Sequence, residues 1–220
     1  MQGWIFPMRS RPSVLLAALF VSITILVMSG AVDGIDQAAI ISAQGAGGDD
    51  TVDFLIQITT ETGDVIYMLV LAIILLIIRP TRRIGITLMI LLVISTILAG
   101  YIKCGVDRDR PQEQYDAIHL PVEVSRDTFA LFCEGGATAS YPSGHAIRSV
   151  IIAILLAYAI YPRFPRGALL LFIYPASVSV SRILVLQHYP TDVVAGIVLG
   201  ILLTGILAHQ TKLYNIHSKT

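Results

Sequence analysis

Long apolar segments separated by short polar ones dominate the chain. Six segments are apolar over most of their length: Ser13–Val32, Thr62–Ile78, Ile84–Ile102, Ala146–Tyr161, Ala168–Leu186 and Val193–Ala208. Because an α-helix rises about 1.5 Å per residue, each segment is close to the length that crosses a hydrocarbon core of about 30 Å. The pattern predicts an all-α fold, a bundle of six transmembrane helices. We expect residues 1–220 to form a single membrane-embedded domain.

The composition supports a membrane protein and argues against a nucleic-acid binder. Of the 220 residues, 55% are hydrophobic and 14% are charged, and the mean hydropathy is +0.76. Soluble domains usually carry about 25% charged residues. The net charge is zero, so the chain has no basic excess to neutralise a nucleic-acid backbone. The expected partner is therefore the lipid bilayer.

Basic and acidic residues are segregated along the chain. If the N-terminus is cytoplasmic, the cytoplasmic segments are 1–12, 79–83, 162–167 and 209–220. These segments hold nine of the fifteen basic residues and none of the fifteen acidic residues. Because basic residues are enriched in cytoplasmic loops, this distribution predicts that both termini are cytoplasmic.

Two segments on the opposite side are long. Asp33–Glu61 is acidic, and its residues 51–58 fit either an amphipathic surface helix or a solvated loop. Lys103–Gly144 is long enough to be functional rather than a simple connection. It contains Cys104 and Cys133, which we expect to form a disulfide because this side is oxidising; free thiols are the alternative.

Three groups of polar residues lie at the extracytoplasmic ends of the predicted helices. They are Lys103 with Arg110-Pro111, then Tyr141-Pro142-Ser143-Gly144-His145, and then Ser181-Arg182 with His188 and Asp192. Arginine offers a planar fork that matches phosphate oxygens, and lysine adds a compact charge. The Pro-Ser-Gly-His group resembles a helix start, where a serine hydroxyl, a glycine and the helix N-terminus favour an anion. A simple helix cap has the same residues, so the group alone leaves both interpretations open.

His188 and Asp192 are four residues apart, which is one helical turn. With a helix beginning near Tyr189-Pro190, Asp192 can accept from one imidazole nitrogen and leave the other nitrogen free for nucleophilic attack. The alternative is a structural hydrogen bond at a helix N-terminus, where an acidic residue is favourable. The spacing of this pair alone does not separate the two.

The order of the three groups is more informative than any one of them. The three groups match, in order, the signature of the type 2 phosphatidic acid phosphatase superfamily. The first part is a lysine, six residues and Arg-Pro, and the second is Pro-Ser-Gly-His. The third is Ser-Arg, five residues, a histidine, three residues and an aspartate. The resemblance covers the signature region, residues 103–192, without a departure. The six-helix layout is similar to the membrane branch of that superfamily.

The resemblance implies a role for each residue of the signature. His188 is expected to attack phosphorus and form a phosphohistidine, Asp192 to orient the His188 imidazole, and His145 to act as general acid and base. The expected phosphate ligands are Lys103, Arg110, Ser143, Gly144 and Arg182. With side chains supplying the positive charge, the resemblance implies no metal and no cofactor.

Arg148 lies one turn after His145, inside a predicted membrane helix. An ionisable residue at such a position is usually functional. Arg148 either binds the second phosphate of a diphosphate substrate or pairs with an acidic residue such as Asp107 or Asp109. The sequence leaves both interpretations of Arg148 open.

The resemblance implies a multi-pass membrane enzyme that removes phosphate from a membrane lipid at the extracytoplasmic face. The expected substrate is a polyprenyl diphosphate, which would be converted to the monophosphate. The alternatives are a phosphatidate or phosphatidylglycerophosphate phosphatase and a lipid phosphotransferase. A non-catalytic lipid binder or transporter is a more remote alternative, because it would not require both His145 and His188.

Overall fold

The regular structure of the described residues is helical throughout. The structure is a computed structural model that describes residues 4–44, 49–111, 133 and 139–214. Its elements are α1 (Arg11–Met28), α2 (Asp33–Ala43), α3 (Asp50–Glu61), α4 (Val65–Ile77), the 3-10 turn η3 (Arg79–Thr81), α5 (Arg82–Val106), α6 (Gly144–Ile160), α7 (Pro165–Leu170), α8 (Ile173–Leu184) and α9 (Pro190–Gln210). For this part of the chain, the prediction of an all-α fold is confirmed.

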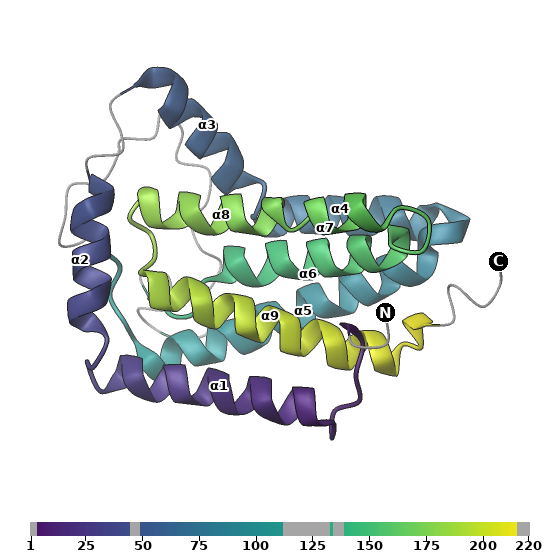
Figure 1. Cartoon of the computed structure of the whole chain (residues 1–220), viewed down its shortest axis with the longest axis horizontal. Helices are drawn as coiled ribbons and strands as arrows, with labels where there is room; N and C mark the ends of the chain where they lie inside the picture. The colour runs from purple at the N-terminus through teal and green to yellow at the C-terminus, as the bar shows by residue number, and fades with distance from the viewer. Residues whose placement is uncertain (1–3, 45–48, 112–132, 134–138, 215–220) are drawn as a thin grey trace.

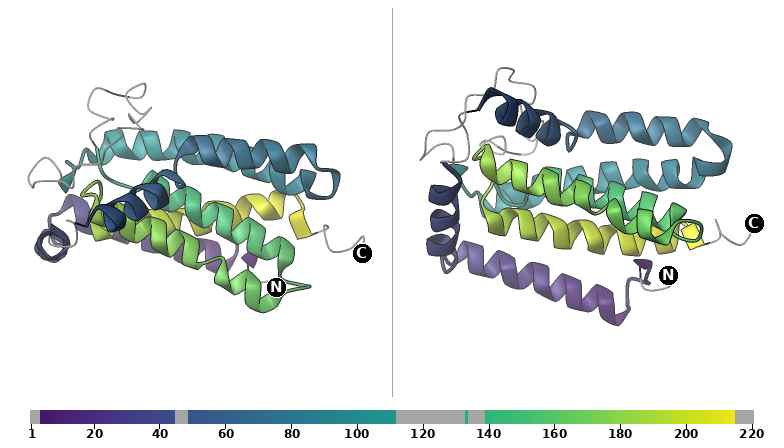
Figure 2. Two further views of the ribbon diagram at one scale, coloured as in Figure 1. Left: turned by 90° about the horizontal axis from the view of Figure 1, so that it is seen from above. Right: turned by 45° about the horizontal axis from the view of Figure 1, so that its top comes forward.

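The long helices form a bundle with two different ends (Figure 1). The start of α1, the end of α9 and the connections α4–α5 and α6–α7 lie at one end. The other end carries α2, α3, the end of α5, the start of α6 and the turn from α8 to α9, and we refer to it as the α2–α3 end. Figure 2 shows α1 running alongside α9 and α3 leaving the bundle at an angle to α4.

Four membrane spans, or five, are supported by helix length and composition. Four helical units are long and apolar enough to cross a membrane: α1, η3 with α5, α7 with α8, and α9. α3 and α4 are long and apolar enough only as a pair, and they are bent by 55° relative to each other. α6 is apolar and has 17 residues, and α4 alone has 13. Six spans therefore stay a prediction, because α6 is short for a span and α4 is long enough only together with α3.

The predicted segment Ala168–Leu186 consists of two helices rather than one. α7 ends at Leu170 and α8 begins at Ile173. Pro175 explains the break, because it lacks an amide hydrogen and its ring crowds the carbonyl of Leu171, four residues earlier.

The segment Asp33–Glu61 also differs from a plain loop. Residues 51–58 lie in α3, whose N-cap Asp49 accepts from the amides of Thr51 and Val52. α3 has exposed apolar side chains and a buried face that includes Ile56, so the amphipathic helix is the correct alternative. The other helix of this segment, α2, was not predicted from the sequence.

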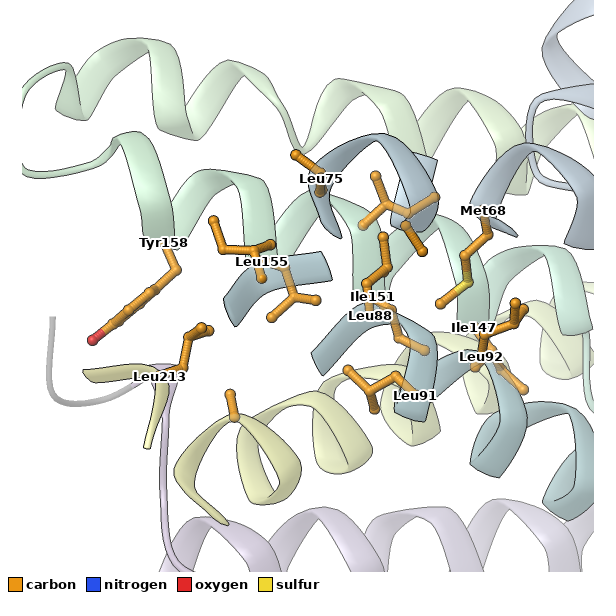
Figure 3. Close-up of a cluster of buried hydrophobic side chains, with 14 of the residues drawn as sticks. Met68, Leu75, Leu88, Leu91, Leu92, Ile147, Ile151, Leu155, Tyr158 and Leu213 are labelled. Carbon is orange, nitrogen blue, oxygen red and sulfur yellow. The ribbon is translucent and has the colours of Figure 1, made fainter. Parts of the chain in front are cut away.

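The apolar core lies where α4, α5 and α6 meet (Figure 3). Met68 of α4, Leu88 of α5 and Ile151 and Leu155 of α6 are almost fully buried there. Close packing of such side chains gains dispersion energy even where lipid surrounds the bundle. The core thereby fixes the positions of α5 and α6, whose ends carry signature residues.

α6 and α9 pack unusually closely through two glycines of α9. A Cβ added to Gly196 would lie 2.6 Å from the carbonyl oxygen of Ser143, and one added to Gly200 would lie 2.9 Å from that of Ile147. Neither distance is compatible with a side chain, so this Gly-x-x-x-Gly face lets the two helix backbones approach. The contact brings the starts of α6 and α9 side by side.

Candidate active site

α6 begins at the α2–α3 end with the predicted Pro142–His145 motif. Ser143 is the N-cap, and its Oγ accepts from the amide of Ala146 at 3.4 Å. The amide of Ser143 donates to the carbonyl oxygen of Asp192 at 3.0 Å. The hydroxyl hydrogen of Ser143 takes no part in the bond from Ala146, so the side chain can still donate to an anion.

Tyr141, immediately before this motif, ties α1 to the start of α6. It is fully buried, and its hydroxyl lies 2.7 Å from Oγ1 of Thr24. Burial raises the pKa of Tyr141 to about 12, so the phenol stays protonated at physiological pH. The hydroxyl therefore acts as a neutral structural group rather than as a charge.

The start of α9 carries the predicted histidine–aspartate pair. Pro190 occupies the first turn of α9, where its missing amide hydrogen costs nothing. Asp192 Oδ2 accepts from the amide of Tyr189 at 2.8 Å, which fixes the carboxylate at the helix start. Nδ1 of His188 lies 3.9 Å from the same oxygen, which is longer than a hydrogen bond. The two side chains face each other without being in hydrogen-bond contact.

The turn between α8 and α9 places His188 beside Arg182. The amides of Gln187 and His188 donate to the carbonyl oxygen of Arg182 at 3.1 and 3.3 Å. The chain reverses at Leu186, whose φ is +54°. A non-glycine residue at positive φ costs about 1 kcal/mol or more, and burial of Leu186 against Ile40 helps to offset that cost. The turn is thus held by packing and by backbone hydrogen bonds.

Gln187 connects two of the predicted phosphate ligands. Its Oε1 accepts from Arg110 Nη1 at 2.5 Å and from Arg182 Nη2 at 3.5 Å. Both arginines are largely buried. A neutral oxygen between them brings the first and third sequence groups together. This role of Gln187 was not predicted from the sequence.

Lys103 lies in the last turn of α5 and is almost completely buried. Its Nζ donates to the carbonyl oxygen of Ala139, just before the second sequence group. The adjacent Cys104 forms a disulfide with Cys133, the pairing expected from the sequence, with their Cα atoms 6.0 Å apart. The disulfide joins the end of α5 to the segment that leads toward α6.

Arg148 folds back against His145 and Gly144. Its Nη2 lies 3.3 Å from His145 Nδ1, and its Nε donates to the carbonyl oxygen of Gly63 at 2.9 Å. A Cβ added to Gly144 would lie 3.0 Å from Nη1 of Arg148. Gly63 also lies against His145, since a Cβ added to Gly63 would lie 2.9 Å from Cδ2 of His145. Both glycines thus make room for the Arg148–His145 pair.

The bend between α3 and α4 is held against the site by three hydrogen bonds. They run from Arg182 Nη1 to Thr60 Oγ1 (3.2 Å), from Tyr174 Oη to Thr62 O (2.8 Å) and from Arg148 Nε to Gly63 O (2.9 Å). The position of α3 is therefore coupled to side chains of the signature region. This coupling could not be predicted from the sequence, because the two partners are far apart along the chain.

Arg108 is a charged residue of the site that the sequence analysis missed. Nη1 of Arg108 donates to Asp192 Oδ1 at 2.8 Å, and its Nη2 donates to Asp36 Oδ2 at 2.8 Å. Its guanidinium carbon lies 4.1 Å from the centre of the Tyr189 ring. Burial alone would lower the pKa of Arg108, but the carboxylates of Asp192 and Asp36 outweigh that effect and raise it. Arg108 is therefore permanently charged.

The signature residues are gathered into one buried cluster. Each of the following side chains is at most 7% exposed: Lys103, Arg110, Ser143, His145, Arg148, Arg182, His188 and Asp192. Arg182, Arg148 and Arg110 lie close enough to His145 to act on it electrostatically. Electrostatic interactions are stronger away from water, so such a cluster of cations can hold an anion beside the imidazoles.

The structure is that of a multi-pass membrane protein in which histidines and cations share one buried cluster. Comparison with known proteins identifies the class. Residues 84–215 match the PAP2 superfamily, and the chain therefore belongs to that family. The match covers more than half of the chain and includes the whole signature region.

Two curated relatives are phosphatases. The chain is 32% identical over 117 residues to the lipid A 1-phosphatase of Rhizobium johnstonii. This alignment covers 53% of the chain and 43% of the relative. The chain is 35% identical over 127 residues to the undecaprenyl-diphosphatase of Sulfolobus acidocaldarius. That alignment covers 57% of the chain and 54% of the relative. The matched region thus spans about half the length of these relatives.

A solved structure shares the fold. The crystal structure of a transmembrane PAP2-type phosphatidylglycerolphosphate phosphatase from Bacillus subtilis superposes with a TM-score of 0.71. The alignment covers 94% of this chain and 96% of that one at 21% sequence identity. It therefore supports the architecture of the bundle over nearly its whole length.

Proposed function

We propose that the protein is a lipid phosphatase that works through a phosphohistidine on His188. The observation that carries the proposal is the convergence of His188, Asp192 and His145 with several buried cations at the α2–α3 end. The best candidate for the substrate is a polyprenyl diphosphate, hydrolysed to the monophosphate. This assignment is consistent with the undecaprenyl-diphosphatase among the relatives.

In the first step, Nε2 of His188 attacks phosphorus while the bond from phosphorus to the leaving oxygen breaks. As the 3.9 Å gap closes, the Asp192 carboxylate accepts a hydrogen bond from Nδ1–H of His188 and so stabilises the positive charge that the imidazole gains. His145 donates a proton to the leaving oxygen. The products are a phosphohistidine and a lipid monophosphate, or a lipid alcohol if the substrate is a monoester.

In the second step, water attacks the phosphohistidine. His145, now deprotonated, takes a proton from the water, the phosphorus–nitrogen bond breaks, and inorganic phosphate leaves. Lys103, Arg110 and Arg182 neutralise the three equatorial oxygens in both transition states. The Ser143 hydroxyl and the Gly144 amide add two further donors at the start of α6. We propose that this charge makes a metal unnecessary.

Arg148 favours a diphosphate over a monoester. Because a guanidinium only donates, His145 Nδ1 must act as the acceptor in their 3.3 Å contact, so His145 carries its proton on Nε2. His145 needs a second proton to act as an acid, and Arg148 must first release Nδ1. A second substrate phosphate would supply Arg148 with a stronger acceptor. Of the alternative substrates, phosphatidate has no second phosphate, and in phosphatidylglycerophosphate a glycerol separates the second phosphate from the one that is removed.

A groove beside the site supports a lipid substrate. It has a volume of about 480 Å³ and lies between α3 and α8. Its lining includes Val52, Leu55 and Thr59 of α3 and Ala176, Val180 and Ser181 of α8. Ser181 and Thr59 directly precede Arg182 and Thr60, which are hydrogen-bonded to each other at the site. We propose that the hydrocarbon chain lies in this groove while the phosphate contacts Arg182.

The activity has a direct test in detergent with excess EDTA. Wild-type protein should release phosphate from a polyprenyl diphosphate without added metal, and His188→Ala should lower kcat by about a thousandfold or more. His209→Ala, at the other end of α9, is the matched control and should keep wild-type activity. Activity that requires added magnesium would refute metal independence. A fully active His188→Ala variant would refute the mechanism.

We further propose six spans, cytoplasmic termini and a site at the extracytoplasmic face. Basic residues such as Arg79 and Arg166 lie at the end of the bundle opposite the site, which supports this orientation. In intact cells, an impermeant thiol reagent should label Gln37→Cys on α2 but not Arg166→Cys on α7. Both positions are exposed. The reverse labelling pattern would contradict the orientation.

The groove predicts a chain-length effect. Ala176→Trp should fill part of the groove and raise KM for a long-chain polyprenyl diphosphate by about tenfold, which is roughly 1.4 kcal/mol of binding. The same variant should hydrolyse a short, water-soluble diphosphate at the wild-type rate. Leu170→Trp, exposed on α7 outside the groove, is the control. Equal effects on the long and short substrates would rule out this location for the chain.

A further inference from the structure

The Arg108 guanidinium occupies the centre of a buried network beside the His188–Asp192 pair. α5 ends at Val106, and the left-handed conformation of its C-cap Asp107 (φ +48°) turns the chain back toward α9. Aspartate tolerates this conformation better than most residues. Arg108 is the next residue, and its side chain is 12% exposed. The turn at Asp107 thus directs a guanidinium to the start of α9.

We propose that Arg108 and Asp36 are positioning residues that hold Asp192 in the orientation needed by His188. The inference rests on the proposed function and extends it to two residues outside the family signature. Asp36 also lies outside residues 84–215, the part of the chain that matches the family. An element that precedes the matched region, α2, thereby completes the site.

The two oxygens of Asp192 have separate tasks in this arrangement. Oδ1 accepts from Arg108 Nη1 at 2.8 Å. Oδ2 accepts from the Tyr189 amide at 2.8 Å and faces His188 Nδ1 at 3.9 Å. Because a carboxylate is planar, holding Oδ1 prevents rotation that would turn Oδ2 away from His188. Arg108 also supplies the charge that a fully buried carboxylate requires.

Asp36 completes the network from the other side. Its side chain is fully buried, and Oδ2 accepts from Arg108 Nη2 at 2.8 Å. Oδ1 of Asp36 accepts from the amide of Thr191 at 3.2 Å, and the Thr191 hydroxyl donates to Oδ2. Thr191 Oγ1 in turn accepts from Arg108 Nη1 at 2.9 Å. Asp36 therefore anchors both Arg108 and the residue that precedes Asp192.

The contacts of Arg108 point to positioning rather than to phosphate binding. Its described hydrogen bonds run to carboxylates and to Thr191, and its flat face lies over the Tyr189 ring. A cation that is already engaged by two buried carboxylates is a poor ligand for a third anion. Loss of Arg108 should therefore lower the rate of phosphoryl transfer and leave phosphate affinity nearly unchanged.

The test measures kcat, KM and the inhibition constant of inorganic phosphate in detergent, for two positioning variants and for the control and rescue variants described below. Arg108→Lys keeps the charge but loses the planar fork that spans Asp192 and Asp36, so kcat should fall by about thirtyfold or more. Asp36→Asn should lower kcat by about tenfold. In both variants, KM and the phosphate inhibition constant should stay within about threefold of wild type.

Asp33→Asn is the matched control. Asp33 also faces Arg108, with Asp33 Oδ1 3.3 Å from Nη2, but its side chain is 52% exposed. An exposed ion pair contributes little, so kcat should change by less than about twofold. Added guanidinium should restore part of the activity of Arg108→Ala, which a general loss of folding would not permit.

The outcomes separate this inference from the proposed function. Wild-type rates in Arg108→Lys and Asp36→Asn would overturn the inference alone. A parallel rise in KM and in the phosphate inhibition constant would also overturn it, since Arg108 would then be a phosphate ligand. A wild-type protein that hydrolyses no lipid phosphate would refute the proposed function, and the positioning role with it.

Discussion

The close packing of α6 against α9 is the contact on which the site depends. Gly196 and Gly200 leave no side chain between the two helices, so backbone meets backbone near Ser143 and Ile147. The starts of both helices then lie side by side, and the Ser143 amide reaches the carbonyl oxygen of Asp192 at 3.0 Å. Each helix start contributes partial positive charge and one histidine of the site. The spacing between these histidines is thus determined by an apolar helix interface.

Buried charge is the second constraint at the α2–α3 end. Several cations lie together there, and burial of charge is costly unless each group has polar partners. The bend between α3 and α4 supplies neutral oxygens to Arg148 and Arg182, and Gln187 supplies another to Arg110 and Arg182. Arg108 instead pairs with carboxylates. We infer a division between cations that can receive a phosphate and one cation that orients the nucleophile's partner.

The sequence predicted the parts of this site that depend on local spacing. The positions of the apolar segments, the helix start at Ser143 and the four-residue step from His188 to Asp192 are all local patterns. The break before α8 was missed although Pro175 was visible, because the apolar run continues through it. Gln187, Asp36 and Arg108 were missed for a different reason. Their roles arise from contacts between distant elements, and no local pattern distinguishes them from solvated polar residues.

The central claim is that His188 becomes phosphorylated during turnover. The direct measurement is rapid acid-free quenching of enzyme mixed with radiolabelled polyprenyl diphosphate, followed by peptide mapping. The account predicts an acid-labile phosphate on the peptide that contains His188 and no labelled peptide in His188→Ala. Turnover without label on His188, or label on another residue, would contradict the account.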